Sequence, residues 1–227
     1  TGNAAAQGLL LNEVESDAPS DVSEACAYVE ILGVPGSIVP AGTFFFSVDG
    51  DSGNFGSLSF IQDLSGVVVG PNGTITLVTL GQPCAGRVFP AGTTIVQVDT
   101  ILGLGQTAET YMLVSAPVGS AFFETDDIDA NDDGMIDPVF GITVIDAIAY
   151  ITQAGATIGY GPILASGEAD VPDAATRFAG NPTALSAAAW YYGEVLAAGD
   201  NSTTYTAPLS PNFPPGGMLT PGAPNAP

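Results

Sequence analysis

Short apolar runs separated by turn residues are the dominant pattern along this chain of 227 residues. The runs are rich in β-branched and aromatic residues and are bounded by Gly, Pro, Asn, Asp and Ser, which is typical of β-strands. We predict strands at 9–13, 27–32, 43–48, 66–69, 74–80, 94–98 and 110–114. Runs that recur at roughly 8 to 20 residues favour an all-β sandwich or barrel with some long loops. The 29 glycines and 18 prolines also favour turns over helices.

The second half of the chain has a less regular pattern. Residues 142–150 fit either a buried strand or a short helix, and their β-branched content favours the strand. The alanine-rich stretch 183–198 could hold one helical turn, but a strand around Trp190 explains it better. The proline-rich tail 208–227 is expected to be extended, with Leu209, Phe213 and Leu219 as its apolar anchors.

These patterns predict a simple domain organisation. Residues 1–7 are expected to form a flexible leader, 8–207 one continuous β domain, and 208–227 the extended tail. An acidic loop at 124–140 is inserted into the β domain.

The charge balance changes the range of partners that we consider. The net charge is −22, because 24 acidic residues are opposed only by Arg87 and Arg177, with no lysine and no histidine. No basic patch can form, so nucleic acid and anionic membrane surfaces are unlikely partners. No apolar run approaches the roughly 18 residues that span a bilayer, so we expect no membrane insertion. Soluble cations must neutralise part of the negative charge.

Cysteine content and the scarcity of basic residues indicate an extracellular protein. Cys26 and Cys84 form an even pair in a sequence that does not begin with methionine, so we expect a secreted or cell-surface protein with one disulfide. The alternative is two unpaired buried thiols. Trypsin-like proteases would find at most two cleavage sites, which suits a durable extracellular protein. Asn72 and Asn201 begin sequons for glycosylation.

The most informative motif is the acidic loop at 129–137, which reads Asp-Ala-Asn-Asp-Asp-Gly-Met-Ile-Asp. Oxygen-bearing side chains occupy the first, third, fifth and ninth positions and glycine the sixth, which is the spacing of an EF-hand or dockerin calcium loop. We predict Ca²⁺ ligands from the side chains of Asp129, Asn131, Asp133 and Asp137, from the backbone carbonyl of Met135, and from Asp127. The alternative is a solvated acidic turn.

The residues around this loop favour a structural clip over a calcium switch. Phe140 stands at the twelfth position, where a sensor loop has a bidentate glutamate. Further oxygens must therefore come from elsewhere, with Asp127, Glu124 and Asp146 nearest in sequence. Because Pro138 and Gly141 follow the loop, we expect no long exiting helix.

Other acidic groups give weaker signals. Residues 49–54 could hold a second ion or form a hairpin turn. A second group near the start lacks loop-motif spacing and is interpreted as a solvated face or a weak cation site; its members are Glu13, Glu15, Asp17, Asp21 and Glu24. Asp146 lies within an apolar run and needs a partner, either Arg177 or the calcium ion.

The sequence does not indicate an enzyme. Without histidine and lysine the chain lacks the commonest general base, imidazole zinc ligands and Schiff-base chemistry. No pair of carboxylates is singled out for glycoside hydrolysis. Trp190, Tyr191 and Tyr192 could form a sugar-stacking platform, although burial in a strand explains them as well.

Several motifs, taken in order, resemble the lamin tail domain family. Residues 11–14 (Leu-Asn-Glu-Val) and 28–31 (Tyr-Val-Glu-Ile) are similar to its "INEV" and "EYVEL" strands. The loop 129–137 and the closing 220–225 (Thr-Pro-Gly-Ala-Pro-Asn) resemble the "DxNxDGxxD" insert and "TPGxxN" ending of secreted bacterial members. The chain departs from the pattern at Ala27, which replaces the first acid of "EYVEL". The resemblance covers about residues 8 to 225 and implies an immunoglobulin-like β-sandwich, but it implies little about function.

From these observations we expect an extracellular, calcium-stabilised structural protein that self-assembles into a filament, surface layer or matrix. Its partners would be further copies of itself, and cations would offset the repulsion between them. The alternative is an adhesion or carbohydrate-binding module that takes a glycan ligand.

Overall fold

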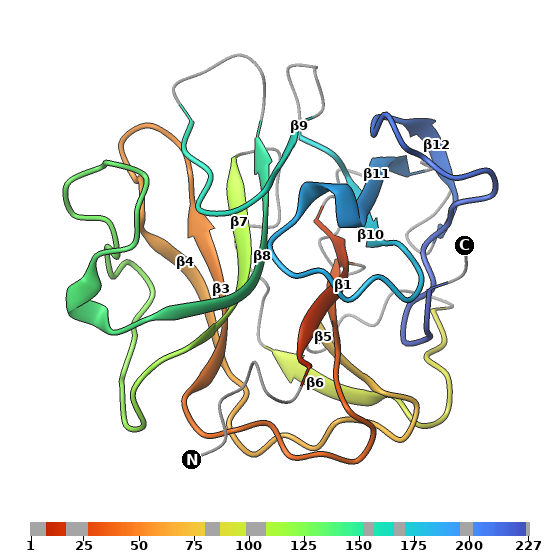
Figure 1. The fold of residues 1–227 in the computed structure, drawn as a ribbon, viewed down its shortest axis with the longest axis horizontal. Helices are drawn as coiled ribbons and strands as arrows, with labels where there is room; N and C mark the ends of the chain where they lie inside the picture. Colours follow the sequence, from red (N-terminus) through yellow and green to blue (C-terminus); the bar gives the residue numbers. More distant parts are fainter. Residues whose placement is uncertain are drawn as a thin grey trace.

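The computed structural model describes residues 8–16, 27–79, 87–98, 108–151, 157–165, 171–195 and 202–225. These residues form two β-sheets packed face to face (Figure 1), which confirms the predicted all-β sandwich. The leader at 1–7 and both cysteines lie outside the described residues, so the predicted leader and disulfide stay predictions. No helix of the described segments is long and apolar enough to cross a membrane.

One sheet has seven strands in the order β12-β11-β10-β1-β2-β5-β6, and the other has five in the order β4-β3-β7-β8-β9. Neighbouring strands are antiparallel except for the parallel pairs β5–β6 and β8–β9. The strands are β1 Leu10–Glu15, β2 Tyr28–Leu32, β3 Thr43–Asp49, β4 Leu58–Asp63, β5 Thr74–Thr79, β6 Thr94–Val98, β7 Glu109–Ser115, β8 Thr143–Ile151, β9 Ile163–Ala165, β10 Ala174–Arg177, β11 Trp190–Val195 and β12 Tyr205–Pro208. Two short 3₁₀ helices complete the described elements, η3 at Pro138–Phe140 and η4 at Ala187–Ala189.

Most of the predicted strands are confirmed, including the strand readings of 142–150 and of the stretch around Trp190. The predicted strand at 66–69 is wrong. These residues belong to the β4–β5 connection, where Val68 forms only an isolated bridge with Ile38. The strand in this part of the chain is β4, which ends before these residues. The sequence pattern missed β4 because its second half, Ile61-Gln62-Asp63, carries polar residues at the edge of the sheet.

The main core lies between the two sheets. Leu11, Val29 and Leu77 of the seven-stranded sheet belong to the same cluster as Phe45 and Leu113 of the five-stranded sheet, and all five are fully buried. This contact is the reason why the strands need the apolar residues that the sequence pattern shows.

Both sheets are also covered on part of their outer faces by the protein's own loops. Phe44 and Phe46 alternate with Phe45 along β3 and form a second cluster with Phe122 and Phe140 of the β7–β8 connection. Because β3 is buried on both faces, its sequence is a continuous aromatic run and shows no alternation of apolar and polar residues.

The outer face of the seven-stranded sheet has an equivalent cover. Tyr191 and Tyr205 form a third cluster with Phe213 and Leu219 of the tail. Two of the three predicted tail anchors are therefore confirmed, whereas Leu209 does not belong to this cluster.

Candidate functional site

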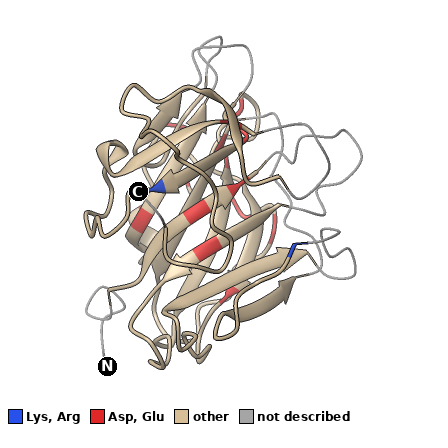
Figure 2. Cartoon of the chain, turned by 90° about the vertical axis from the view of Figure 1, so that its right-hand side faces the viewer, with Lys and Arg blue, Asp and Glu red and all other residues tan. Residues whose placement is uncertain are grey.

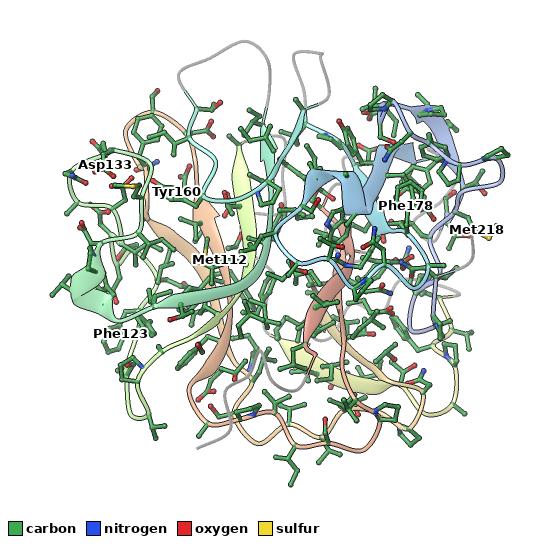
Figure 3. The ribbon with its side chains drawn as sticks, in the orientation of Figure 1. Met112, Phe123, Asp133, Tyr160, Phe178 and Met218 are labelled. Carbon is green, nitrogen blue, oxygen red and sulfur yellow. The ribbon has the colours of Figure 1, made fainter. Side chains whose placement is uncertain are left out.

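The acidic loop lies in the β7–β8 connection, over the outer face of the five-stranded sheet (Figures 1 and 3). Its middle is fixed to the sandwich by Ile128, which is buried in the second cluster and donates its backbone N–H to the carbonyl of Gly56 at 2.9 Å. Gly56 has φ 74°, and a Cβ atom there would lie 2.7 Å from the Cβ of Asp129. Glycine at 56 therefore lets the loop approach the β3–β4 turn.

Asp129 is the structural centre of the loop. Its side chain is buried, with 0% exposure, and its two oxygens accept three hydrogen bonds. The donors are the backbone N–H of Asp133 at 3.1 Å, that of Gly134 at 2.8 Å, and the hydroxyl of Tyr160 at 2.9 Å. Burial, and then the hydrogen bond to Asp129, raise the pKa of Tyr160, so its hydroxyl stays a proton donor. Sequence reasoning missed Tyr160, which follows β8 and contacts the loop from outside it.

The other predicted ligands organise the loop through shorter-range hydrogen bonds. Asp127 accepts from the backbone N–H of Asp129 at 2.9 Å, and Asp137 accepts from that of Ala130 at 3.1 Å. Asn131 donates its amide to Asp133 at 2.9 Å. Glycine is required at position 134, where φ is 82°.

A calcium ion would need several of these oxygens close together. The described part of the chain contains no group of three or more Asp, Glu, His or Cys side chains close enough to hold a metal. The donor set is nevertheless the one that Ca²⁺ prefers, since it consists of carboxylate and amide oxygens around a glycine turn. A carboxylate has about four acceptor positions, so the three donors to Asp129 leave one for a cation. The residues therefore suit a hard cation in their chemistry, whereas their present spacing does not gather three acids.

The charge of the loop favours a bound cation more strongly than its geometry does. The β7–β8 connection carries seven acidic residues and no basic residue between 117 and 142. Both arginines of the chain are bonded elsewhere, Arg87 to Glu15 and Arg177 to Asp146. The loop therefore has no cationic side chain of this protein beside it.

Asp146 was expected to pair with either Arg177 or a calcium ion, and in the structure it pairs with Arg177. Its guanidinium forms a buried ion pair with Asp146 and donates to the carbonyl of Leu11 at 2.6 Å. Asp146 also accepts from the backbone N–H groups of Leu11 at 3.0 Å and Leu185 at 2.9 Å. Burial raises the pKa of Asp146, and the charge of Arg177 opposes that shift. Asp146 therefore connects the two sheets and does not contribute to the calcium loop.

The prediction of a solvated face at Glu13 and Glu15 is wrong, because both side chains are fully buried. Glu13 lies directly opposite Glu30 on the neighbouring strand β2. It accepts from the hydroxyl of Tyr28 at 2.6 Å and from the backbone N–H of Thr220 at 2.9 Å. Burial raises the pKa of Glu13 to about 7. Burial, and then the charge of Glu13, raise the pKa of Glu30.

Three of the four motifs singled out in the sequence meet at this point, namely residues 11–14, 28–31 and 220–225. Glu30 accepts from the side chain of Asn12 at 2.6 Å and from the backbone N–H of Gly222 at 2.5 Å. Asn225 donates to the side-chain oxygen of Asn12 at 3.0 Å and to the carbonyl of Arg177 at 2.6 Å. Residues 220–225 thus cover the carboxylates of β1 and β2 with matched donors, which is an architectural role.

Glu15 has a different partner on the same sheet face. Arg87 binds it through both terminal nitrogens, at 2.5 and 3.2 Å, and lies over the ring of Tyr28 with 4.9 Å to its centroid. Burial raises the pKa of Glu15 to about 7, and the charge of Arg87 opposes that shift. Asp17, Asp21 and Glu24, the other members of the predicted group, lie outside the described residues.

Sequence reasoning missed a further buried carboxyl, Glu109 at the start of β7. It accepts hydrogen bonds from Ser47 at 2.5 Å and from Ser59. Burial raises the pKa of Glu109 to about 8, so it holds a proton at neutral pH. The nearby residues 49–54 form the hairpin-turn alternative, in which the backbone N–H of Asp51 donates to Asp49 at 2.7 Å. They belong to no described metal-binding group.

The suggested sugar platform is also wrong. Trp190 and Tyr191 have 0% exposure, so their faces are part of the core, and only Tyr192 is partly exposed. The guanidinium of Arg177 lies over the ring of Trp190, 4.6 Å from its centroid.

The asparagine of the first glycosylation sequon, Asn72, uses its side-chain amide in hydrogen bonds within the protein. The amide of Asn72 donates to Thr93 at 2.9 Å and to the carbonyl of Gly222 at 2.7 Å, which leaves it unsuited to carry a glycan in the folded protein. Asn201 lies outside the described residues.

Comparison with known proteins does not add a relative to this description. No family model matches the chain, and neither a curated protein nor a solved structure shows significant similarity to it.

Proposed function

We propose that this chain is an extracellular structural protein that is stabilised by calcium and self-assembles into a filament, surface layer or matrix. The observation that carries the proposal is the acidic loop, which is organised around the buried Asp129 and has no basic residue between 117 and 142. A bound Ca²⁺ supplies the missing positive charge there.

The residues that would hold the ion are Asp129, Asn131, Asp133 and Asp137, with Asp127 and the carbonyl of Met135 as further oxygens. Asn131 presents its oxygen after a half-turn of its amide, because its nitrogen is the atom that now contacts Asp133. Since Ile128 and Phe140 fix both sides of the loop to the second cluster, the ion acts as a clip. The segment after Asp137 is the three-residue helix η3, which ends at Gly141 with φ 62°, so the loop has no long helix to move.

The way the polar groups are used supports a structural role. The buried acids of β1, β2 and β8 bind Thr220, Gly222, Arg87 and Arg177, and Trp190 and Tyr191 of β11 are buried in the core clusters. In the described segments these contacts join strands and tail within the sandwich. We therefore favour assembly over the adhesion alternative.

The test is to image the purified protein by electron microscopy and to measure its sedimentation with millimolar calcium, before and after addition of a chelator. We expect ordered assemblies with calcium and their dissolution by the chelator. A protein that stays monomeric at millimolar calcium would contradict the assembly. Assemblies that ignore the chelator would contradict the role of the ion.

A further inference from the structure

The loops at one end of the sandwich carry no charged residue, although the chain as a whole has a net charge of −22. These loops are the β2–β3 connection at 33–42 and the β4–β5 connection at 64–73, which lie together at the bottom of Figure 1. Figure 2 shows the same end without acidic or basic residues on its loops. Asp63, the exposed last residue of β4, borders these loops, and its carboxylate accepts the backbone N–H of Ser65 at 2.8 Å. We call the two loops themselves the uncharged end.

The two loops form a rigid apolar ridge. Backbone hydrogen bonds of 2.8 Å join Val39 to Val67 and Val69 to Ser37, on either side of the bridge between Ile38 and Val68. In this arrangement Ile38 and Val68 are a non-hydrogen-bonded pair, so their side chains lie close together on one face. That face is open to solvent, because Ile38 is 60% exposed and Val68 is 48% exposed.

A groove of about 340 Å³ lies beside the ridge. Leu10, Leu32, Val34, Phe178 and Pro182 contribute to its walls, and no acidic residue lines it. Its one charged lining residue is Arg177, which is already paired with Asp146. The turn at 34–37 separates groove from ridge and is bonded to the ridge through Gly36, whose N–H donates to Val69 at 3.0 Å. Ridge and groove are therefore parts of one surface.

Charge identifies the occupant of this surface. Two copies with 24 acidic and two basic residues each repel one another wherever carboxylates face each other. They can approach most closely through surfaces that lack acids, and contacts between like surfaces close with two-fold symmetry. We infer that the uncharged end binds the uncharged end of a second copy of this chain, with the ridge of each copy in the groove of the other. This inference rests on the proposed self-assembly and names one of its contacts.

The experiment is sedimentation velocity over a range of protein concentrations, in calcium and in moderate salt, for the wild type and for Ile38→Asp. Because a two-fold contact contains the substitution twice, we expect Ile38→Asp to weaken the association about a hundredfold. Ile163→Asp is the matched control, since Ile163 is 49% exposed on β9, at the opposite end of the sandwich in Figure 1 and outside the acidic loop. We expect this control to associate as the wild type does.

A second measurement removes any dependence on the folding of the variant. In the wild type, backbone amides of 33–42 and 64–73 should exchange hydrogen more slowly as the protein concentration rises, while those of 117–142 should not change through this contact. Val68→Asp and Ile38→Asp should each remove that protection.

The outcomes separate the surface from the function. Calcium-dependent assembly that is equally strong in Ile38→Asp would overturn the surface and leave the proposed function standing. Loss of association on deletion of residues 1–7, with Ile38→Asp unaffected, would make the leader the occupant of the groove and overturn the inference. A wild type that is monomeric under every condition would overturn both the inference and the proposed function.

Discussion

Carboxylates are neutralised in different ways in two regions of this molecule. On β1 and β2, Glu13 and Glu30 are buried under residues 220–225, which donate backbone and side-chain hydrogen bonds to them. In the β7–β8 connection, seven acids lie together without a basic residue, and only Asp129 among the predicted ligands is fully buried. The first region is completed by the chain itself, and the second depends on what the solution supplies. Acidic residues therefore stabilise the fold on β1 and β2, whereas in the β7–β8 connection they form a candidate ion site.

The largest expected effect comes from breaking a neutralised pair. Replacing Arg177 with methionine leaves Asp146 buried without its counter-ion, and we expect the free energy of unfolding to fall by about 3–5 kcal/mol. Urea denaturation measures this loss. The double replacement Arg177→Met with Asp146→Leu should recover much of it, because no uncompensated charge then remains. A single Arg177→Met variant as stable as the wild type would contradict the neutralisation of buried Asp146 by Arg177.

Stability should also depend on pH through the buried acids. Glu13 and Glu109 have pKa values raised from 4.5 to about 7 and about 8, so the folded state retains protons that the unfolded state has lost. Their contribution to stability is fully present below pH 4.5 and is lost as the pH rises through 7 to 8. Each group should add a slope of about 1.4 kcal/mol per pH unit within its range.

Denaturation midpoints between pH 5 and pH 9 would check this slope. Glu109→Gln should flatten the upper part of the profile, because an amide keeps the hydrogen-bonding shape without titrating. Glu124→Gln, in the acidic loop, is the matched control and should leave the profile as it is. Equal profiles for all three proteins would show that the slope comes from the overall negative charge.

Calcium should act on the second region only. At a calcium concentration of about one hundred times the dissociation constant, binding stabilises the folded state by about 2.7 kcal/mol. We expect Asp129→Asn to remove this increment, measured as the difference in melting temperature with and without a chelator. Asp132→Asn should keep it, since Asp132 is exposed and its φ of 55° suits asparagine. An increment that survives in Asp129→Asn would place the ion elsewhere.

The smallest expected effect comes from Asn225, at the end of the segment 220–225 that covers Glu13 and Glu30. Asn225→Ala removes the hydrogen bonds to Asn12 and to the carbonyl of Arg177. We expect a loss of about 1–2 kcal/mol, because these bonds are partly buried. Asn181→Ala, which removes a local bond to the N–H of Thr183 on an exposed turn, should cost less. A larger loss from the second variant would contradict the covering role of 220–225.

Local pattern was sufficient for most of the fold. β6 coincides with its predicted range, and the strand reading of β8 was correct because Val144, Ile145 and Ile148 suit a buried strand. Local pattern failed at β4, whose second half is polar, and at the short strands β9, β10 and β12, which were not predicted. It also predicted a strand at 66–69, where Val68 forms only an isolated bridge.

The site was predictable only where its contacts are local. The spacing of Asp129, Gly134 and Asp137 is contained in nine residues, so the sequence identified the loop. Tyr160 was invisible because it is 31 residues away from Asp129. Glu13 looked solvated because its partner Thr220 is 207 residues away, and no pattern of apolar positions encodes such a contact.

The cover at 220–225 has a consequence for how the protein is made. Its contacts with β1 join residues up to 213 positions apart, so the first strand to be synthesised among the described residues is completed by almost the last. A chain that stops before Thr220 leaves Glu13 and Glu30 without their closing donors at neutral pH. The acids of β1 and β2 are therefore fully covered only after residues 220–225 have been synthesised, and products truncated before Thr220 would be more open to degradation.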